Sequence, residues 1–416
     1  MSERRLHTDL LAYAGRLLLE YNESTGTIHR TLTAVAKALT DESCHVVVSY
    51  GGVAVSPSEE SPALQPIREL RYNAALQARV HAILTQLRQG ELKAAEALAQ
   101  LRRVEADTPR HSRGVAMVIL GSAAASLAGL LGADAAAAAV AGLATGLGLL
   151  ARQELGRRQF SLLMVPLTAA FIGAVLGGLA IRLDWTRTPA LVLVVPALML
   201  VPGPHLINGL LDLIDNYLPM SLARLGLAVG ILLASALGIA LGVEITLPGP
   251  LPHQRGADVD RLNLVTDMVL AGVVTCGFAV FYNATWRQVG MAAVGGMAGN
   301  GFRFLGLEAG FSLEVATFLG GLAVGVISGW MARSNKTPFA VIAFAGAVTM
   351  MPGLHIYRAL GGFLQLARLT NETDPAAMAG TLGNASQACL VVGGLALGLI
   401  VGGRAMLAFG GEPRIV

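Results

Sequence analysis

The sequence contains a series of long apolar stretches that begins near Val115 and continues almost to the C-terminus. A helix that crosses a bilayer needs about 20 mainly apolar residues, because each residue adds about 1.5 Å and the hydrocarbon core is about 30 Å thick. The ten stretches that approach or reach this length are residues 115–132, 134–151, 161–181, 188–203, 222–243, 263–283, 288–306, 312–331, 338–352 and 383–403. This pattern predicts an α-helical polytopic membrane protein with about ten transmembrane helices.

The first 113 residues, here called the front domain, differ from the rest in charge. They hold 14 Lys/Arg and 13 Asp/Glu, whereas the remaining 303 residues hold 30 charged residues between them. Apolar residues recur at helical spacing in residues 10–21, and short strand-like runs flank Gly51 and Gly52. We therefore expect a small α+β domain at residues 1–113, a first membrane half at 114–247, a connecting loop at 248–261 and a second membrane half at 262–416.

The distribution of charge also predicts an orientation. Residues 1–22 carry Arg4, Arg5, Asp9, Arg16 and Glu20, so no signal peptide is expected and the front domain should stay in the cytoplasm. Most Arg and Lys residues between the predicted spans fall on the same side as the N-terminus. Five spans in each half would place the halves in opposite orientations, which predicts an inverted 5+5 repeat with both termini cytoplasmic.

A helix-breaking motif occurs twice, about 150 residues apart. The first copy comprises Thr188, Pro189, Pro202, Gly203, Pro204 and His205, and the second comprises Thr337, Pro338, Pro352, Gly353 and His355. Pro and Gly interrupt a helix, and the freed backbone groups are tolerated at membrane depth only inside protein or beside a cavity. Matching interrupted segments in two halves are the best sequence indication of a transporter's substrate site. The motif therefore predicts a carrier.

Polar residues follow each break at helical spacing. The first stripe consists of His205, Asn208, Asp212 and Asp215, and the same offsets after the second break give His355, Arg358, Gly362 and Gln365. One stripe is anionic and the other cationic, which suits a zwitterion whose carboxylate meets Arg358 and whose ammonium meets Asp212. Asn208 and Tyr357 would then face a hydroxyl group. The alternative is a pair of interfacial helices whose polar face meets water or lipid head groups.

Several carboxylates are candidates to bind a coupling proton, because burial in the membrane disfavours their charged form. These candidates are Asp212, Asp215, Asp267 and Glu314. Asp267 and Glu314 each lie about one turn inside a predicted span, where snorkelling to the interface is the alternative. Asn300 and Arg303 are spaced three apart and are further candidates to line a cavity in the second half.

Other functional classes lack support. The net charge of +3 is too small to indicate nucleic-acid binding, and the three cysteines are too few and scattered for a disulfide framework or a thiolate metal cluster. None of the three lysines follows a glycine, which excludes a phosphate-binding loop, and HExxH and GxSxG are absent. We expect no enzyme activity, no cofactor and no bound metal.

The order of these segments resembles the threonine/serine exporter family of bacterial inner-membrane carriers. The resemblance is strongest at the front helix (residues 10–20) and at residues 202–209, and it is looser in the second half around Pro352, Gly353 and Tyr357. It implies export of L-threonine and L-serine, coupled to the proton gradient, across a bacterial inner membrane. The partners that it implies are an amino acid, protons and the lipid bilayer; a homo-oligomer is left open.

Three other interpretations stay open. The protein could export a different small organic acid. It could be a membrane-embedded enzyme that uses His205, Asp212 and Asp215 for acid–base or metal chemistry, although no nucleophile motif accompanies them. The front domain could be a sensor that gates a pore, and its sequence neither supports nor excludes that role.

Overall fold

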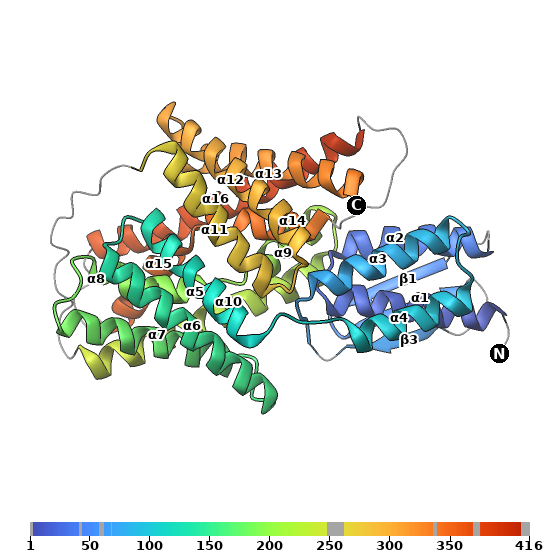
Figure 1. Cartoon of the computed structure of the whole chain (residues 1–416), viewed down its shortest axis with the longest axis horizontal. Coiled ribbons are helices and arrows are strands. Elements are labelled where there is room, and N and C mark those ends of the chain that lie inside the picture. The colour runs from blue at the N-terminus through green and yellow to red at the C-terminus, as the bar shows by residue number, and fades with distance from the viewer. Residues whose placement is uncertain are drawn as a thin grey trace.

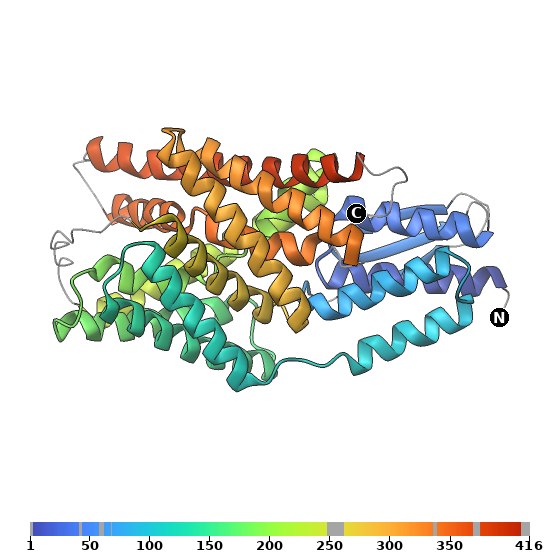
Figure 2. The same ribbon diagram turned by 45° about the horizontal axis from the view of Figure 1, so that its top comes forward.

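The computed structural model describes residues 3–40, 44–57, 62–67, 69–247, 262–335, 339–368 and 375–408 (Figure 1). The predicted connecting loop at 248–261, together with Thr337 and Pro338 of the second motif, lies outside these residues. The front domain sits at one end of a bundle of long helices, and the view turned by 45° shows the same arrangement (Figure 2).

The front domain is an α+β unit. Its elements are α1 (Glu3–Glu20), α2 (Thr25–Thr40), β1 (Cys44–Ser49), β2 (Gly52–Pro57), β3 (Ala63–Pro66), α3 (Ala74–Arg88) and α4 (Ala94–Asp107). The strands form an antiparallel sheet in the order β1-β2-β3, with Val46 opposite Val55. Leu17 and Leu18 of α1 are fully buried, as the helical spacing predicts. A side chain at Gly15 would meet Val53 at 2.8 Å, so its absence lets α1 lie close against β2.

The membrane part contains two sets of six helices. The first set is α5 (Arg113–Leu130), α6 (Ala135–Arg157), α7 (Met164–Arg182), α8 (Pro189–Leu198), α9 (Gly203–Ile214) and α10 (Leu218–Thr246). The second is α11 (Leu264–Phe281), α12 (Trp286–Glu308), α13 (Leu313–Asn335), α14 (Phe339–Ala347) with the short 3₁₀ helix η1 (Val348–Met350), α15 (Gly353–Arg368) and α16 (Pro375–Ala408). The sets follow the same order of lengths: α5 and α11 each have 18 residues, and α6 and α12 each have 23.

Among the described residues, seven helices are long and apolar enough to cross a membrane, or up to nine spans if each of two bent helix pairs is one span. The bent pairs are α8 with α9, at 61°, and α14 with α15, at 60°. The predicted span at 288–306 is present as α12 but falls short in apolarity, since it includes Gln288, Asn300 and Arg303 beside many glycines. Length and composition therefore support a multi-pass helical membrane protein, in which seven to nine spans meet both criteria within the described residues.

Two helix pairs, α7 with α10 and α13 with α16, pack backbone to backbone through glycine. A Cβ atom at Gly238 of α10 would lie 2.3 Å from the carbonyl oxygen of Leu167, and one at Gly398 of α16 would lie 2.3 Å from that of Phe318. Both figures show α13 and α16 running side by side. Small residues allow this approach in lipid, where van der Waals contact rather than the hydrophobic effect drives helix association.

We expect Gly238→Leu to destabilise the protein by at least about 1–3 kcal/mol, because the new side chain collides with the backbone of α7. Gly226→Leu on the same helix is the matched control, since nothing lies within 4 Å of a Cβ atom there. The measurement is the thermal unfolding midpoint of each variant in detergent. Equal midpoints for the two variants would contradict the close packing of α7 and α10.

Candidate functional site

The first break comprises residues 199–202, between α8 and α9. The start of α8 is fixed by Asp134, whose Oδ2 accepts hydrogen bonds from the Oγ1 atoms of Thr186 at 2.7 Å and Thr188 at 3.0 Å. Pro189 follows as the first residue of the helix, where its missing N–H costs nothing. The ten residues of α8 rise about 15 Å, which is half the thickness of the hydrocarbon core. If α8 starts at one membrane surface, the first break lies near the middle.

The second break comprises residues 351–352, between η1 and α15, and it lies against the first. A Cβ atom at Gly353 would lie 2.8 Å from Leu198, and one at Gly203 would lie 3.5 Å from Met351. The buried Tyr357 of α15 donates a hydrogen bond from its hydroxyl to the carbonyl oxygen of Ala197, at 3.0 Å. Tyr357, predicted to face the substrate, thus connects the two bent pairs in this structure.

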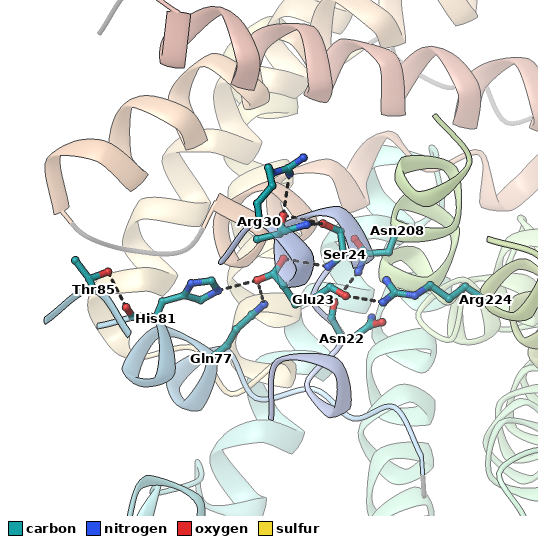
Figure 3. Close-up of polar contacts among 10 residues, drawn as sticks. Asn22, Glu23, Ser24, Arg30, Gln77, His81, Thr85, Asn208 and Arg224 are labelled. Atoms are coloured by element: carbon teal, nitrogen blue, oxygen red, sulfur yellow. Dashed lines mark hydrogen bonds and ion pairs between the residues drawn. The ribbon is translucent and has the colours of Figure 1, made fainter. Parts of the chain in front are cut away.

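The polar stripe of α9 holds the front domain. Asn208 Nδ2 donates to the carbonyl oxygen of Asn22 at 2.6 Å, and Asp212 Oδ1 accepts from the backbone N–H of Thr25 at 2.9 Å. Asp212 Oδ2 also lies 3.3 Å from Nε of Arg224 on α10, and both side chains are fully buried. Arg224 in turn donates to the carbonyl oxygen of Glu23 (Figure 3). The α1–α2 turn, residues 22–25, is thus fastened to the helix that follows the first break.

The turn is supported from within the front domain by the carboxylate of Glu23. It accepts hydrogen bonds from Gln77 Nε2 at 2.6 Å and from the backbone N–H of Ser24 at 3.1 Å, and it lies 3.0 Å from Nε2 of His81 (Figure 3). Burial alone raises the pKa of a carboxyl group. Here His81, Ser24 and Gln77 outweigh burial and lower the pKa of Glu23 below its ordinary value.

The remaining predicted site residues are dispersed. Asp215 pairs with Arg404 at 2.7 Å near the surface, and His355 Nδ1 lies 3.0 Å from Oδ1 of Asn384. Arg358 is exposed. The predicted carboxylates in the second half have amide partners: Asp267 accepts from Asn300, and Glu314 accepts from Gln387 at 2.9 Å. Among the described residues, no group of three or more His, Cys, Asp or Glu side chains is arranged to hold a metal ion.

A cavity of about 100 Å³ lies at the first break. Its lining includes Pro202 from the break, Pro204 and His205 from the start of α9, Arg152 from α6, Tyr282 at the end of α11, and Tyr72 from the front domain. The ring of Tyr72 lies 5.5 Å from that of His205 and 5.2 Å from that of Tyr282, measured between centroids. His205 is 3% exposed, and its Nδ1 has no hydrogen-bond partner in the described part of the chain. The cavity is therefore a small, mainly apolar space with a few polar groups.

Sequence reasoning missed Arg152, Tyr72 and Tyr282 as parts of this site. Tyr72 carried no signal, because its place in the cavity depends on how the front domain docks. Arg152 did carry one: it lies 151 residues before Arg303, and the helices α6 and α12 that contain them also begin 151 residues apart, at Ala135 and Trp286. Matching positions in a repeat are visible in the sequence once the helix starts are aligned.

The fold is that of a multi-pass helical membrane protein with paired helix breaks. Two family profiles cover most of the chain: "Putative threonine/serine exporter" matches residues 9–246, and "Threonine/Serine exporter, ThrE" matches residues 267–403. The chain belongs to the threonine/serine exporter family, as the resemblance of its front helix and first break predicted. No solved structure matches it.

We expect acidification to weaken the front domain partly through Glu23. Because its folded-state pKa lies below its unfolded value, Glu23 contributes stability above the unfolded pKa, and this is lost as the pH falls through the folded pKa. The measurement is the unfolding midpoint of the full chain from neutral to acidic pH. Glu23→Gln should show a smaller decline than the wild type, whereas the exposed control Glu91→Gln should decline like the wild type.

Asp212→Asn should loosen the front domain, because it leaves Arg224 as an uncompensated buried charge, at a cost of roughly 3–5 kcal/mol. Asp215→Asn, which removes a partly exposed ion pair, should cost under about 1 kcal/mol. Hydrogen exchange of residues 20–30 in the full-length protein measures the difference. Equal protection in the two variants would show that the buried pair does not hold the turn.

Proposed function

We propose that the protein is a secondary exporter of small hydroxy amino acids, L-threonine and L-serine, driven by the proton gradient. The observation that carries this proposal is the pair of bent helices, α8/α9 and α14/α15, at matching places in the two halves and in contact with each other. Interrupted helices of this kind expose backbone groups near the middle of the membrane, where carriers bind small polar substrates. Membership of an exporter family supports the direction of transport.

The matching order of helix lengths supports an inverted 5+5 repeat. Seven apolar helices, the two bent pairs as one span each, and α12 together give the ten proposed transmembrane segments. The helix α12 is less apolar than the others. Its Asn300 side chain is hydrogen-bonded to Asp267 of α11, so this polar group has a partner inside the protein. In this arrangement the front domain and both termini are cytoplasmic, in a bacterial inner membrane.

Alternating access would move one half against the other around the two breaks. Asn208 and Asp212 of α9 are bonded to the α1–α2 turn. A movement of α9 therefore either carries the front domain with it or breaks these hydrogen bonds. Among the four candidate carboxylates, we propose Asp267 as the proton carrier. It is bonded to Asn300 and interacts with Arg303, whereas Asp212 holds the front domain, Asp215 forms a surface ion pair and Glu314 has an amide partner, Gln387.

The test is efflux of preloaded labelled L-threonine from cells that produce the chain, with and without a protonophore. We expect faster efflux than in cells without the protein, collapse of that efflux with the gradient, and loss of it in His205→Ala and Asp267→Asn. Asp215→Asn is the matched control and should keep efflux. Efflux that persists without the gradient would contradict proton coupling.

Absence of threonine and serine efflux, in cells whose membranes contain the protein, would contradict the proposed cargo. The same cells are then loaded with other small organic acids. Export of one of these acids would show that the protein is a carrier with a different substrate. That is one of the alternatives that the sequence left open.

A further inference from the structure

Arg152 and Arg303 occupy the same place in the two halves but have different surroundings. Each is the eighteenth residue of a 23-residue helix, α6 or α12. Arg303 interacts electrostatically with Asp267, the fourth residue of α11, and Asp267 is also bonded to Asn300. The second half thus carries its own anion beside its arginine.

The first half has the arginine without the anion. The fourth residue of α5, the counterpart of Asp267, is Ala116, and the counterpart of Asn300 is Leu149. No carboxylate lines the cavity that Arg152 borders, and no carboxylate of the described chain lies within ion-pair distance of its guanidinium. The guanidinium carbon lies 4.8 Å from the centre of the Phe281 ring, so one face of the planar group is covered, while its N–H donors have no hydrogen-bond partner among the described residues.

The first break supplies acceptors in the same cavity. Pro202 and Pro204 have no N–H, and the N–H of Gly203 bonds to the carbonyl oxygen of Val201. Met199 and Leu200 line the cavity, and their carbonyl oxygens receive no hydrogen bond from any residue in the described ranges. The lining thus combines the N–H donors of Arg152 with residues whose carbonyl oxygens are open acceptors, which matches the two ends of an α-amino acid.

We infer that Arg152 binds the carboxylate group of the substrate. The substrate carboxylate then lies beside Arg152 as the Asp267 carboxylate lies beside Arg303. The fork of the guanidinium binds a carboxylate through two parallel hydrogen bonds. The ammonium group meets the carbonyl oxygens of Met199 and Leu200, and Tyr72 forms the wall on the side of the front domain. This inference rests on the proposed export of amino acids and assigns the subsite for their shared group.

The size of the cavity restricts the occupant. At about 100 Å³ it is well below the ~300–1,000 Å³ of pockets that hold drug-sized ligands. Tyr72, Tyr282 and Phe281 contribute aromatic side chains to its lining. Short aliphatic amino acids and other small carboxylates fit this description.

The test measures binding of L-threonine to the purified full-length protein in nanodiscs. Arg152→Gln should weaken binding by about ten- to a hundredfold, as expected for loss of a charge-assisted hydrogen-bonded pair. Arg157→Gln is the control, because Arg157 is an exposed arginine at the end of the same helix. Threoninol, which lacks the carboxylate, should bind equally weakly to the wild type and to Arg152→Gln.

A second pair of variants installs the missing anion. Ala116→Asp supplies the carboxylate that the second half has at this position and should abolish threonine binding by pairing with Arg152. Ala116→Asn adds nearly the same volume without the charge and should bind threonine more tightly than Ala116→Asp. Thermal unfolding without ligand identifies any variant that fails to fold, and Arg152→Gln then remains the decisive comparison.

The outcomes separate this inference from the proposed cargo. Unchanged threonine affinity in a folded Arg152→Gln variant would overturn the inference and leave the exporter proposal intact. If the wild type binds neither threonine nor serine, the cargo is wrong, and acetate and lactate are tested on the same variants. Binding of these acids that depends on Arg152 would support the carboxylate site, and no carboxylate binding to the wild type would overturn it.

Discussion

The structure depends on how broken backbone is satisfied inside an apolar bundle. At the first break, prolines remove donors and the N–H groups of Gly203 and His205 turn back to Val201 and Pro202. The carbonyl oxygen of Ala197 accepts a hydrogen bond from the backbone N–H of Leu200 and a second one from the hydroxyl group of Tyr357 on the second bent pair. Unsatisfied groups cost several kcal/mol each in such surroundings. The hydroxyl group of Tyr357 therefore links the second bent pair to the first, and the close approach of Gly353 to Leu198 keeps the two breaks against each other.

Local features of the fold could be predicted from the sequence. The apolar spacing of residues 10–21 predicts the buried face of α1, and the Pro-Gly pairs mark where α9 and α15 begin. Each of these features depends only on residues that are neighbours in the sequence, so it can be predicted without knowing how distant segments pack. Gln288, Asn300 and Arg303 lower the apolarity of α12, and the sequence alone does not show that Asn300 and Arg303 meet Asp267 on another helix.

The partners of the candidate site residues could not be predicted in the same way. Helical spacing places Asn208 and Asp212 on one face of α9, but it cannot say that this face meets a turn 186 and 187 residues earlier in the chain. Nor can it show that Arg358 is exposed or that Tyr72 reaches the first break. These facts depend on docking between segments that are distant in sequence. The match between Arg152 and Arg303 is different, since aligning the two repeats by their helix starts brings both arginines to the same position.

The glycine contacts between α13 and α16 have a consequence for how the sequence of this protein can vary. Gly394, Gly398 and Gly402 follow the backbone of α13 at intervals of one helical turn, and Gly321 and Gly325 return the contact from the other side. Since a single methyl group on this seam would displace a whole helix, neither helix can accept a larger residue there unless the other retreats. Substitutions in this pair of helices should therefore accumulate on the faces turned to lipid. At the contact itself, a change in one helix should be accompanied by a change in the other.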